Sequence, residues 1–422
     1  MIATFQQIAR QFEACFPERL PGPRTVGREA EYPVVTADGQ AGDGRRVFQA
    51  LQATDGFRAS TDSGNPDLVV RLDGPGYSYT LEVGLGTIEV NTGPCPHLFQ
   101  LQEQHRRAVQ RLRQACQALG YRLLGYGIQP LTPPSRALMT PKQRYQVLHQ
   151  AMGESWLWYT ITASDQLQVD IARPELVHMV NYGNLITPVV IALCANSPVY
   201  AGRESGLCSA REGRMLAIYS EEQRHGMIRR PFRDMTDYVA TMSQSLCFML
   251  REGERYRVYN RPFTEYLAEH GPDFDAFLFH EHYIWNSARA RTAYGTLELR
   301  SACQQPWDEH MAAAALYLGL VEAADQVTSY LEGLFGAELW PRMHAYHRQA
   351  IATGLAGPEP VSGFLAQLLT LAQRALERRG WGEESLLRPL FRSLAARENP
   401  AQRILARFRS QGLAGLLDAT AL

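Results

Sequence analysis

The order of apolar and polar positions predicts a chain in which short strands alternate with helices. Residues 25–35 (TVGREAEYPVV) carry charged side chains on alternate positions between β-branched residues, which is typical of a strand with one polar face. Residues 66–72 and 77–90 predict two further strands or a strand and a hairpin, with turns at Asp73-Gly74 and at 84–86. Strands are also expected at residues 122–131, 160–171 and 295–302.

In other segments the apolar residues recur with helical spacing. Between Pro96 and Leu119 six residues fall on one helical face: Leu98, Leu101, His105, Val109, Leu112 and Cys116. Helices are also expected at residues 1–16, 141–153 and 174–195, and from about Glu309 onward. No G-x-G-x-x-G or Walker loop follows any predicted strand, so a doubly wound nucleotide-binding fold is not expected. The pattern predicts an α+β protein with one sheet.

Composition and charge narrow the classes of function. The chain has 422 residues and a formal net charge of −1, so no basic field favours nucleic acid or an anionic membrane surface. Runs of about 18 apolar residues are absent from the sequence, and the seven cysteines show no C-x-x-C spacing. We therefore expect a cytoplasmic protein with reduced cysteines. Lys142 is the only lysine, which makes arginine the default ligand for carboxylate or phosphate.

Five glutamates in apolar strand contexts are the candidate metal ligands: Glu29, Glu31, Glu82, Glu89 and Glu298. Glu29 and Glu31 lie two apart on one strand and project from the same face. Such a pair by itself is usually a solvated surface feature, and Glu298 with Arg300 is equally well explained as an ion pair. Gathered on one sheet face, five carboxylates would repel each other strongly unless a cation neutralised them. Mg²⁺ paired with a nucleotide phosphate is the commonest such case.

Six segments carry a resemblance to a known family. They are VGREAEY (26–32), YTLEVGLGTIEVNTGP (79–94), MTPKQRYQVL (139–148), TASDQLQVD (162–170), ANSPVYAGRESGLCSAR (195–211) and GTLELRSA (295–302). In this order they resemble the glutamate–cysteine ligase family of the plant and bacterial type, with its related bacterial carboxylate–amine ligases. The fifth segment, which is similar to A-N-S-P-F-x-x-G-x-x-x-G-x-x-S-x-R, is the longest and most specific. The similarity runs from about residue 26 to about 310 and is weaker in the C-terminal helices.

The resemblance implies a fold and a domain organisation. The fold is the one that glutamine synthetase shares with the guanidino kinases, a curved antiparallel sheet that carries the site and is covered by helices. The implied organisation is a single catalytic domain over residues 1–422. It consists of an N-terminal helix and turn (1–25), a sheet-based core (26–308) and a mainly helical C-terminal part (309–422). A homo-oligomer is compatible with the sequence, which does not fix the oligomeric state.

The resemblance also implies a reaction and its cofactors. ATP phosphorylates a carboxylate to an acyl phosphate, which an amine then attacks, so catalysis depends on positioning and charge neutralisation. The leading substrate pair is glutamate and cysteine, giving γ-glutamylcysteine. Mg²⁺ ions would lie between the ATP phosphates and the five glutamates, and Gln166 and Gln168 would complete the site through their amide oxygens or phosphate contacts.

The basic residues are assigned by position in the same motifs. Arg211 and Arg300 are the candidates for holding the substrate carboxylate or the transferred phosphoryl group through bidentate hydrogen bonds. Lys142 and Arg144 are weaker candidates for the same work, since a solvated loop would also explain them. His280 and His282 are expected to be structural or substrate-facing rather than metal ligands, because the carboxylates already suggest a hard-oxygen site.

Departures from the family leave rival functions open. Gln168 stands where the family has Asn, and Cys303 stands where it has Asp. These changes surround the predicted metal positions, so the amine acceptor, and also the acid, are open. A ligase that joins another acid or amine is the nearer rival. A non-catalytic nucleotide-binding relative and a guanidine kinase are the more distant ones.

Overall fold

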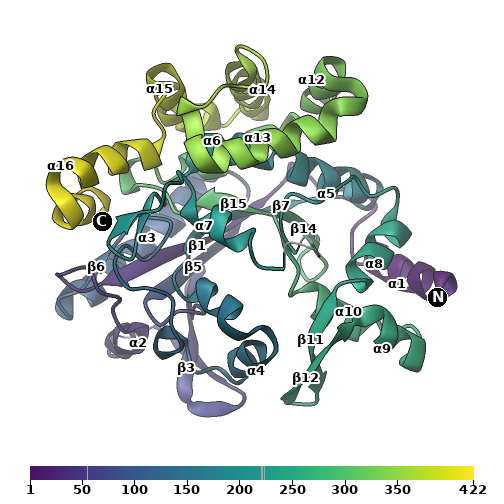
Figure 1. Cartoon of the computed structure of the whole chain (residues 1–422), viewed down its shortest axis with the longest axis horizontal. Helices are drawn as coiled ribbons and strands as arrows, with labels where there is room; N and C mark the ends of the chain where they lie inside the picture. The colour runs from purple at the N-terminus through teal and green to yellow at the C-terminus, as the bar shows by residue number, and fades with distance from the viewer. Residues whose placement is uncertain (55, 220–221, 223) are drawn as a thin grey trace.

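The computed structural model describes residues 1–54, 56–219, 222 and 224–422 (Figure 1). At its centre is a nine-stranded antiparallel sheet with the strand order β14-β15-β7-β1-β5-β4-β3-β2, and β6 pairs with β1. In that order the strands are Ala288–Arg291, Thr296–Cys303, Ser164–Asp170, Val26–Val35, Thr87–Cys95, Tyr77–Leu81, Asn65–Gly74 and Arg58–Asp62, with β6 at Arg122–Leu123. The predicted α+β class with one large antiparallel sheet is confirmed.

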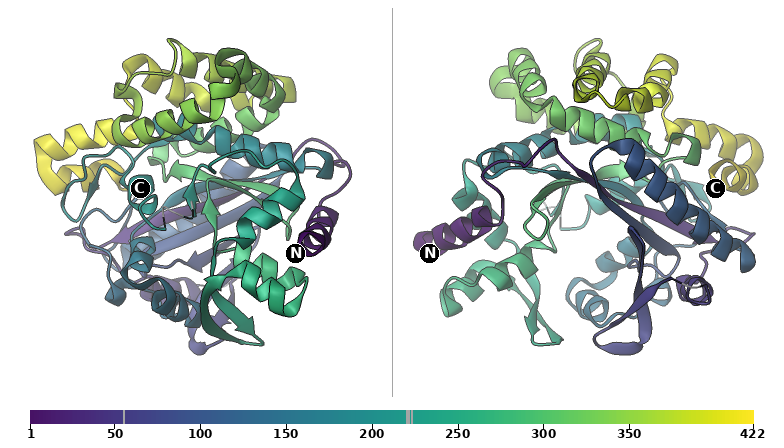
Figure 2. Two further views of the ribbon diagram at one scale, coloured as in Figure 1. Left: turned by 45° about the vertical axis from the view of Figure 1, so that its right-hand side comes forward. Right: turned by 180° about the vertical axis from the view of Figure 1, so that it is seen from behind.

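Helices cover one face of this sheet and form a further layer beyond it (Figures 1 and 2). Helix α3 packs on β5, β1 and β4, and α5, α6 and α11 pack on the other half of the sheet. The C-terminal helices, green to yellow in Figure 1, lie outside α6 and α11.

The helices have the following bounds. Helices α1 to α8 are Ile2–Ala14, Gly44–Gln52, Leu98–Ala118, Gln143–Met152, Leu176–Leu185, Thr187–Cys194, Ala210–Met215 and Met235–Ser243. Helices α9 to α16 are Phe263–His270, Phe274–Glu281, Ala312–Glu322, Ala324–Phe335, Leu339–Thr353, Phe364–Arg379, Arg388–Ala396 and Pro400–Thr420. The six residues predicted to share one face of α3 are all buried. That face is therefore the one that packs on the sheet.

Strand β1 shows how the sequence builds a sheet with two unlike faces. Ala30, Tyr32 and Val34 are fully buried in an apolar core on the side that α3 covers. Because successive side chains point to opposite faces, Glu29 and Glu31 project from the other side. In the pairing with β5, Glu31 lies directly opposite Glu89, and Glu29 lies opposite Asn91. The alternation seen in the sequence thus gathers the carboxylates on one uncovered face.

The helical character expected over 174–195 is confirmed by α5 and α6, which are bent by 41° because Pro188, which has no N–H for a helical bond, lies in the first turn of α6. Two other local predictions were wrong. Strand β3 continues through Asp73 and Gly74, and Gly76 takes the positive φ of the following turn. Of residues 122–131 only Arg122 and Leu123 pair as a strand.

Among the described residues no single helix is long and apolar enough to cross a membrane. Only the bent pair Arg173–Leu185 and Thr187–Cys194 reaches the required length and hydropathy when taken together. Every residue of α6 is buried inside the protein.

Three small two-stranded sheets were not predicted. They are β8 (Val199–Tyr200) with β9 (Arg203–Glu204), β10 (His225–Gly226) with β13 (Trp285–Asn286), and β11 (Leu246–Glu252) with β12 (Arg255–Pro262). The β11–β12 ribbon lies beside α9 and α10 in Figure 1, next to the polar face of the main sheet. It contacts α4 through both of its strands.

Candidate active site

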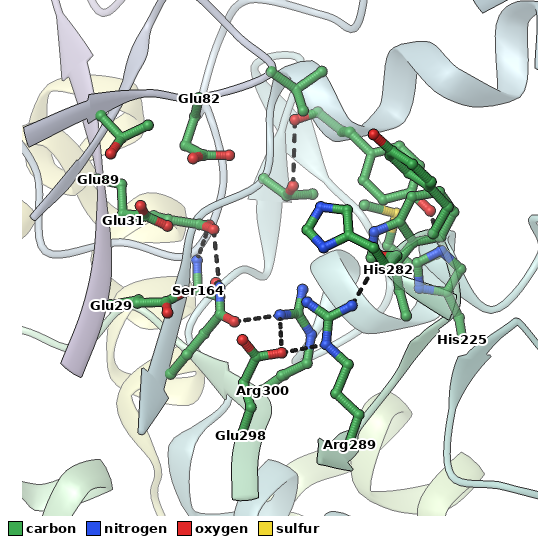
Figure 3. A pocket seen from close by; sticks show the side chains of 18 of the residues that line it. Glu29, Glu31, Glu82, Glu89, Ser164, His225, His282, Arg289, Glu298 and Arg300 are labelled. Carbon is green, nitrogen blue, oxygen red and sulfur yellow. Dashed lines mark hydrogen bonds and ion pairs between the residues drawn. The ribbon is translucent and has the colours of Figure 1, made fainter. Parts of the chain in front are cut away.

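A cavity of about 430 Å³ lies on the polar face of the sheet. All five predicted glutamates line it, together with Gln166, Arg144, Arg211 and Arg300. Figure 3 shows Glu29, Glu31, Glu82 and Glu89 on one side of this cavity and His225 and His282 on the other, with Glu298, Arg289 and Arg300 below. The tertiary structure therefore brings together most of the residues that the motifs singled out.

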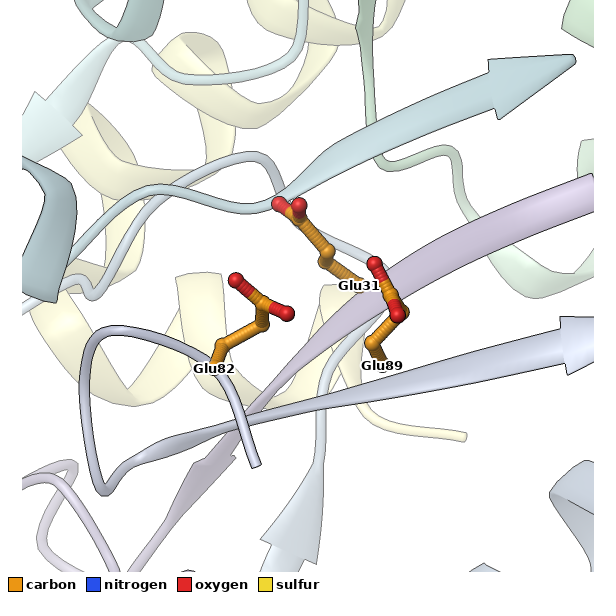
Figure 4. A group of neighbouring side chains, drawn as sticks. All are labelled: Glu31, Glu82 and Glu89. Carbon is orange, nitrogen blue, oxygen red and sulfur yellow. The ribbon is translucent and has the colours of Figure 1, made fainter. Parts of the chain in front are cut away.

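Glu31, Glu82 and Glu89 form an acidic cluster (Figure 4). One carboxylate oxygen from each lies within 4.8 Å of the others. Burial and the neighbouring Glu82 raise the pKa of Glu31 to about 7, and burial with three glutamate neighbours raises the pKa of Glu89 well above its ordinary value. Carboxylates that resist ionisation because of one another favour a bound cation.

Uncharged groups donate hydrogen bonds to this acidic cluster. The backbone N–H of Ser164 donates to Glu31 at 2.6 Å, and the Gln166 side chain donates to it at 3.2 Å. The Asn91 side chain donates to Glu89 at 2.9 Å. Within the described part of the chain, no arginine, lysine or histidine lies at ion-pair distance from the three carboxylates. Their charge is thus left for a ligand to neutralise.

The M-T-P-K segment fixes the loop that carries Glu82. Thr140 donates its hydroxyl to the Glu82 carbonyl at 2.6 Å, and the Lys142 ammonium donates to the Leu81 carbonyl. In the same loop a Cβ on Gly84 would lie 1.8 Å from the Thr160 carbonyl oxygen, so only glycine fits there. Lys142 is buried and does not line the cavity, and its predicted contact with nucleotide remains a prediction.

Glu298 lies in a different electrostatic setting from the acidic cluster. Arg300 donates to it at 2.7 Å, Arg289 forms a further ion pair, and Arg291 lies 3.6 Å away. Burial alone would raise the pKa of Glu298, but these three arginines hold it well below its ordinary value. We call Arg289, Arg291 and Arg300 the arginine cluster. The ion pair of Glu298 with Arg300 lies within strand β15, and a metal at Glu298 remains a prediction.

Two glutamines connect the two kinds of carboxylate. Gln168 donates to Glu29 at 3.0 Å and to Glu298 at 2.8 Å, and its oxygen accepts from Thr296 at 2.6 Å. The Gln166 oxygen accepts from Arg300 at 2.5 Å. Both amide oxygens, which we expected to face a cation or phosphate, are therefore engaged by protein donors. Gln168 lines an adjoining cavity rather than this one.

Arg211 is positioned by the A-N-S-P segment. Asn196 donates to the carbonyls of Gly125 and Gln304, which fixes the chain before Ser197. Ser197 then accepts from the backbone N–H of Arg211 at 3.1 Å at the start of α7. The guanidinium of Arg211 pairs with Glu212 and donates to the Arg300 carbonyl at 3.1 Å. The two arginines predicted to bind substrate thus line one cavity from adjoining elements.

The wall opposite the acidic cluster is aromatic and was not predicted. It contains Trp156, Tyr159, Trp285 and His225, with ring centroids of neighbouring members 4.7 to 5.4 Å apart. Arg289 and Arg291 were also missed. The alternation in A-R-A-R at 288–291 is the only signal in the sequence that could have found them. His282 lines the cavity, whereas His280 is buried against Phe263 in a structural role.

The donor set of the acidic cluster fits a hard divalent cation. Carboxylate oxygens are the ligands that Mg²⁺ takes in proteins, and three of them converge here with no protein cation at ion-pair distance among the described residues. The raised pKa values of Glu31 and Glu89 show the electrostatic cost that such an ion would remove.

Comparison with known proteins identifies related sequences. The sequence profile of glutamate–cysteine ligase family 2 (GCS2) matches residues 26–415. The chloroplastic glutamate–cysteine ligase of Brassica juncea is 24% identical over 367 residues, which cover 82% of this chain and 70% of the relative. The chloroplastic enzyme of Medicago truncatula is 25% identical over 361 residues, covering 80% and 69%.

A solved structure has a similar fold. The glutamate–cysteine ligase of Francisella tularensis, in complex with AMP, superposes with a TM-score of 0.58 over 96% of this chain and 88% of its own, at 10% identity. The family match extends across nearly the whole chain and includes all five glutamates, four of them on β1, β5 and β15 and Glu82 in the loop after β4. The chain therefore belongs to glutamate–cysteine ligase family 2, a family of ATP-dependent carboxylate–amine ligases.

Proposed function

We propose that this protein joins a carboxylic acid, with glutamate as the leading candidate, to an amine through an acyl phosphate made with Mg²⁺ and ATP. The observation that carries the proposal is one cavity with two opposite electrostatic halves. The acidic cluster offers carboxylates without a protein cation, and the arginine cluster with Arg211 offers guanidinium groups a short distance away. A reaction between two anions, a carboxylate and a triphosphate, requires both kinds of group.

The reaction consists of two substitutions. A carboxylate oxygen of the acid attacks the γ-phosphorus of ATP, the bond to the β-phosphate oxygen breaks, and ADP leaves. The amine nitrogen then attacks the carbonyl carbon of the acyl phosphate, phosphate leaves, and the nitrogen loses a proton. Mg²⁺ held by Glu31, Glu82 and Glu89 would neutralise phosphate charge during transfer.

The protein's own side chains orient these groups. Arg300 and Arg211 line the cavity from β15 and α7 and present N–H donors suited to a carboxylate or a phosphoryl oxygen. Glu298 holds Arg289 and Arg300 in place, so the donors are fixed before substrate arrives. Gln166 links Arg300 to Glu31 and so ties the two halves of the site together.

We assign the nucleotide to the adjoining cavity of about 660 Å³, which shares Glu29, Arg71, Asn91 and Tyr294 with the first. It is lined by small residues of the sheet, including Gly27, Ser78, Thr92 and Gly93. Small residues leave room for a long ligand to lie close to the backbone. Such a ligand would reach the acidic cluster past Glu29.

The relatives make glutamate and cysteine the first substrate pair to assay, because those that match are named glutamate–cysteine ligases. An amine larger than cysteine is the second candidate acceptor, because a further cavity of about 910 Å³ adjoins the site. A non-catalytic relative is not favoured, because all five carboxylates are present in one cavity.

The test is to incubate purified protein with ATP, Mg²⁺, glutamate and a panel of amines that includes cysteine and hydroxylamine, and to measure ADP, AMP and phosphate. ADP release that requires both acid and amine supports the ligase. AMP with pyrophosphate would contradict the acyl-phosphate route. ADP release with a guanidine compound, and none with glutamate and amine, would favour a kinase instead.

A further inference from the structure

A second large cavity adjoins the active site and shares no lining residue with the cavity assigned to the nucleotide. Its volume is about 910 Å³, and it shares Arg144, His282 and Tyr283 with the active-site cavity. The β11–β12 ribbon and helices α9 and α10 supply most of its lining. Pockets of this size hold ligands far larger than an amino acid as small as cysteine.

Aromatic rings run from the active site into this cavity. The Tyr283 ring meets Trp285 of the active-site wall at 6.1 Å and meets Phe279 edge-on at 5.3 Å. Phe279 is in turn stacked with Tyr256 of the ribbon, with centroids 5.8 Å apart and planes inclined by 11°. Tyr283, Phe279 and Tyr256 therefore form a continuous aromatic path, which we call the aromatic passage.

The charged groups of this cavity are mostly engaged by the protein and lie toward solvent. Arg257 pairs with Glu252 at 2.8 Å, and Arg251 donates to the Gly253 carbonyl at 3.0 Å. Asp273 accepts from the Tyr266 hydroxyl at 2.8 Å and from the backbone N–H of Ala276. In contrast, Leu250 and Tyr283 are buried. The apolar lining is thus the row of rings together with Leu250, which adjoins Arg144 and His282 where the cavity meets the active site, and the mouth is polar.

We propose that the aromatic passage receives the side chain of the amine acceptor, and that this acceptor is an amine with a bulky aromatic side chain rather than cysteine. The inference rests on the proposed ligase function. It follows from the continuity of the passage with the reaction cavity and from its ring lining, because aromatic groups pack favourably against rings at these separations. A cysteine side chain would leave most of the cavity without apolar contacts.

The other ligands fit this cavity less well than the acceptor does. A nucleotide bound in this cavity would have to extend its triphosphate past Tyr283 into the active site. Arg144 is the arginine that lines both cavities. The small-residue cavity instead leads past Glu29 directly to the carboxylates. The acid must place its carboxylate near the γ-phosphate and the arginine cluster, inside the first cavity. The amine acceptor is the remaining substrate. Only its nitrogen has to reach the first cavity, so its side chain can lie in the second.

The test compares four amines with glutamate, ATP and Mg²⁺ on the full-length protein: phenethylamine, L-phenylalanine, cysteine and hydroxylamine. A phenyl-bearing amine is expected to give a kcat/KM for ADP release about tenfold or more above that of cysteine. A kcat/KM for cysteine equal to or above that of both phenyl amines would overturn the inference. If hydroxylamine still reacts in that case, the ligase proposal survives. If no amine, hydroxylamine included, supports ADP release, the ligase proposal itself fails and this inference with it.

Two variants tie the preference to the passage. Ala276→Trp fills the cavity from α10 and is expected to lower the ratio of phenethylamine to hydroxylamine turnover about tenfold. Tyr256→Ala removes one ring of the passage and is expected to lower the same ratio less. Ala366→Trp, on the exposed side of α14, is the matched control and should leave the ratio unchanged. An unchanged ratio in both passage variants would overturn the inference even if one of them folded poorly.

Discussion

The acidic cluster and Glu298 face the same cavity from the same sheet, yet their charges are compensated in different ways. Glu298 is surrounded by Arg289, Arg291 and Arg300, and its pKa is held well below the ordinary value. Glu31 and Glu89 receive hydrogen bonds from uncharged groups, and their pKa values are raised, by burial first and by neighbouring glutamates second.

The difference shows what each half of the site contributes. A carboxylate that the protein has already paired with arginines serves to orient those arginines, since breaking a buried pair leaves an uncompensated charge. A carboxylate that is left unpaired among others is electrostatically unfavourable until a cation binds. The first half should therefore govern stability and the second half metal-dependent activity.

The largest expected effect lies in the acidic cluster. Glu89→Gln should lower ADP-forming turnover about 100- to 1000-fold, because one ligand to the activating cation is lost. Turnover with saturating substrates and Mg²⁺ affinity by titration calorimetry check this. Glu204→Gln, an exposed glutamate that pairs with Arg409, is the control. Wild-type turnover and Mg²⁺ affinity in Glu89→Gln would end the assignment of this cluster.

Substitution of Glu298, in the half of the site that holds the arginine cluster, should mainly lower the stability of the protein. Glu298→Gln is expected to lower the free energy of unfolding by about 3–5 kcal/mol, because Arg289 and Arg300 would keep their buried charges without a partner. Glu89→Gln in metal-free protein should instead be neutral or stabilising, because it removes a repelling carboxylate. Urea unfolding of both variants in EDTA makes the comparison. Equal loss in the two would contradict the contrast between the halves.

Gln166, which bonds Glu31 and Arg300, connects the two halves, and its substitution should have an intermediate effect on turnover. Gln166→Ala removes the donor to Glu31 and the acceptor from Arg300, and we expect about tenfold lower turnover, since both groups lose their fixed orientation. A matched change is Gln373→Ala on α14, where the glutamine donates to Glu377 far from the site. Initial rates with glutamate and each amine measure the effect, and an unchanged rate would show that the two halves act independently.

The smallest effect concerns pH. Glu31 has a pKa of about 7 in the folded protein against an ordinary 4.5, so the folded state binds more protons between these values. The free energy of unfolding should therefore fall as pH rises through this window. In EDTA we expect Tm to be about 2–5 °C lower at pH 8 than at pH 5.5, and Mg²⁺ should raise Tm more at pH 8.

A matched variant separates this effect from other titrations. Glu31→Gln should make the decline shallower, because no proton is then released at that position, while Glu89, whose pKa is also raised, still contributes. Glu298 contributes no slope in this window, since its lowered pKa affects stability only under more acidic conditions. Thermal melts in EDTA across the window measure both proteins. The same slope in wild type and Glu31→Gln would show that other groups cause the decline.

Much of the site was predictable because strand periodicity is local. The two-residue spacing of Glu29 and Glu31 places them on one face regardless of the rest of the fold, and the register with β5 then places Glu89 opposite Glu31. The aromatic wall, the arginines of β14 and the β11–β12 ribbon were missed. Their side chains meet the site only through contacts between distant segments, such as Trp285 beside Tyr159.

The sequence by itself determined which residues share a sheet face and which motifs recur in family order, because both depend on spacing along the chain. Only the tertiary structure decided which carboxylates are paired. The sequence offered Arg300 as a partner for Glu298 and left metal binding equally open, but β14 lies beside β15 and supplies Arg289 directly opposite Glu298. Strand order thus separates Glu298, which holds arginines, from Glu31, Glu82 and Glu89, which converge on one another, and no local pattern encodes this separation.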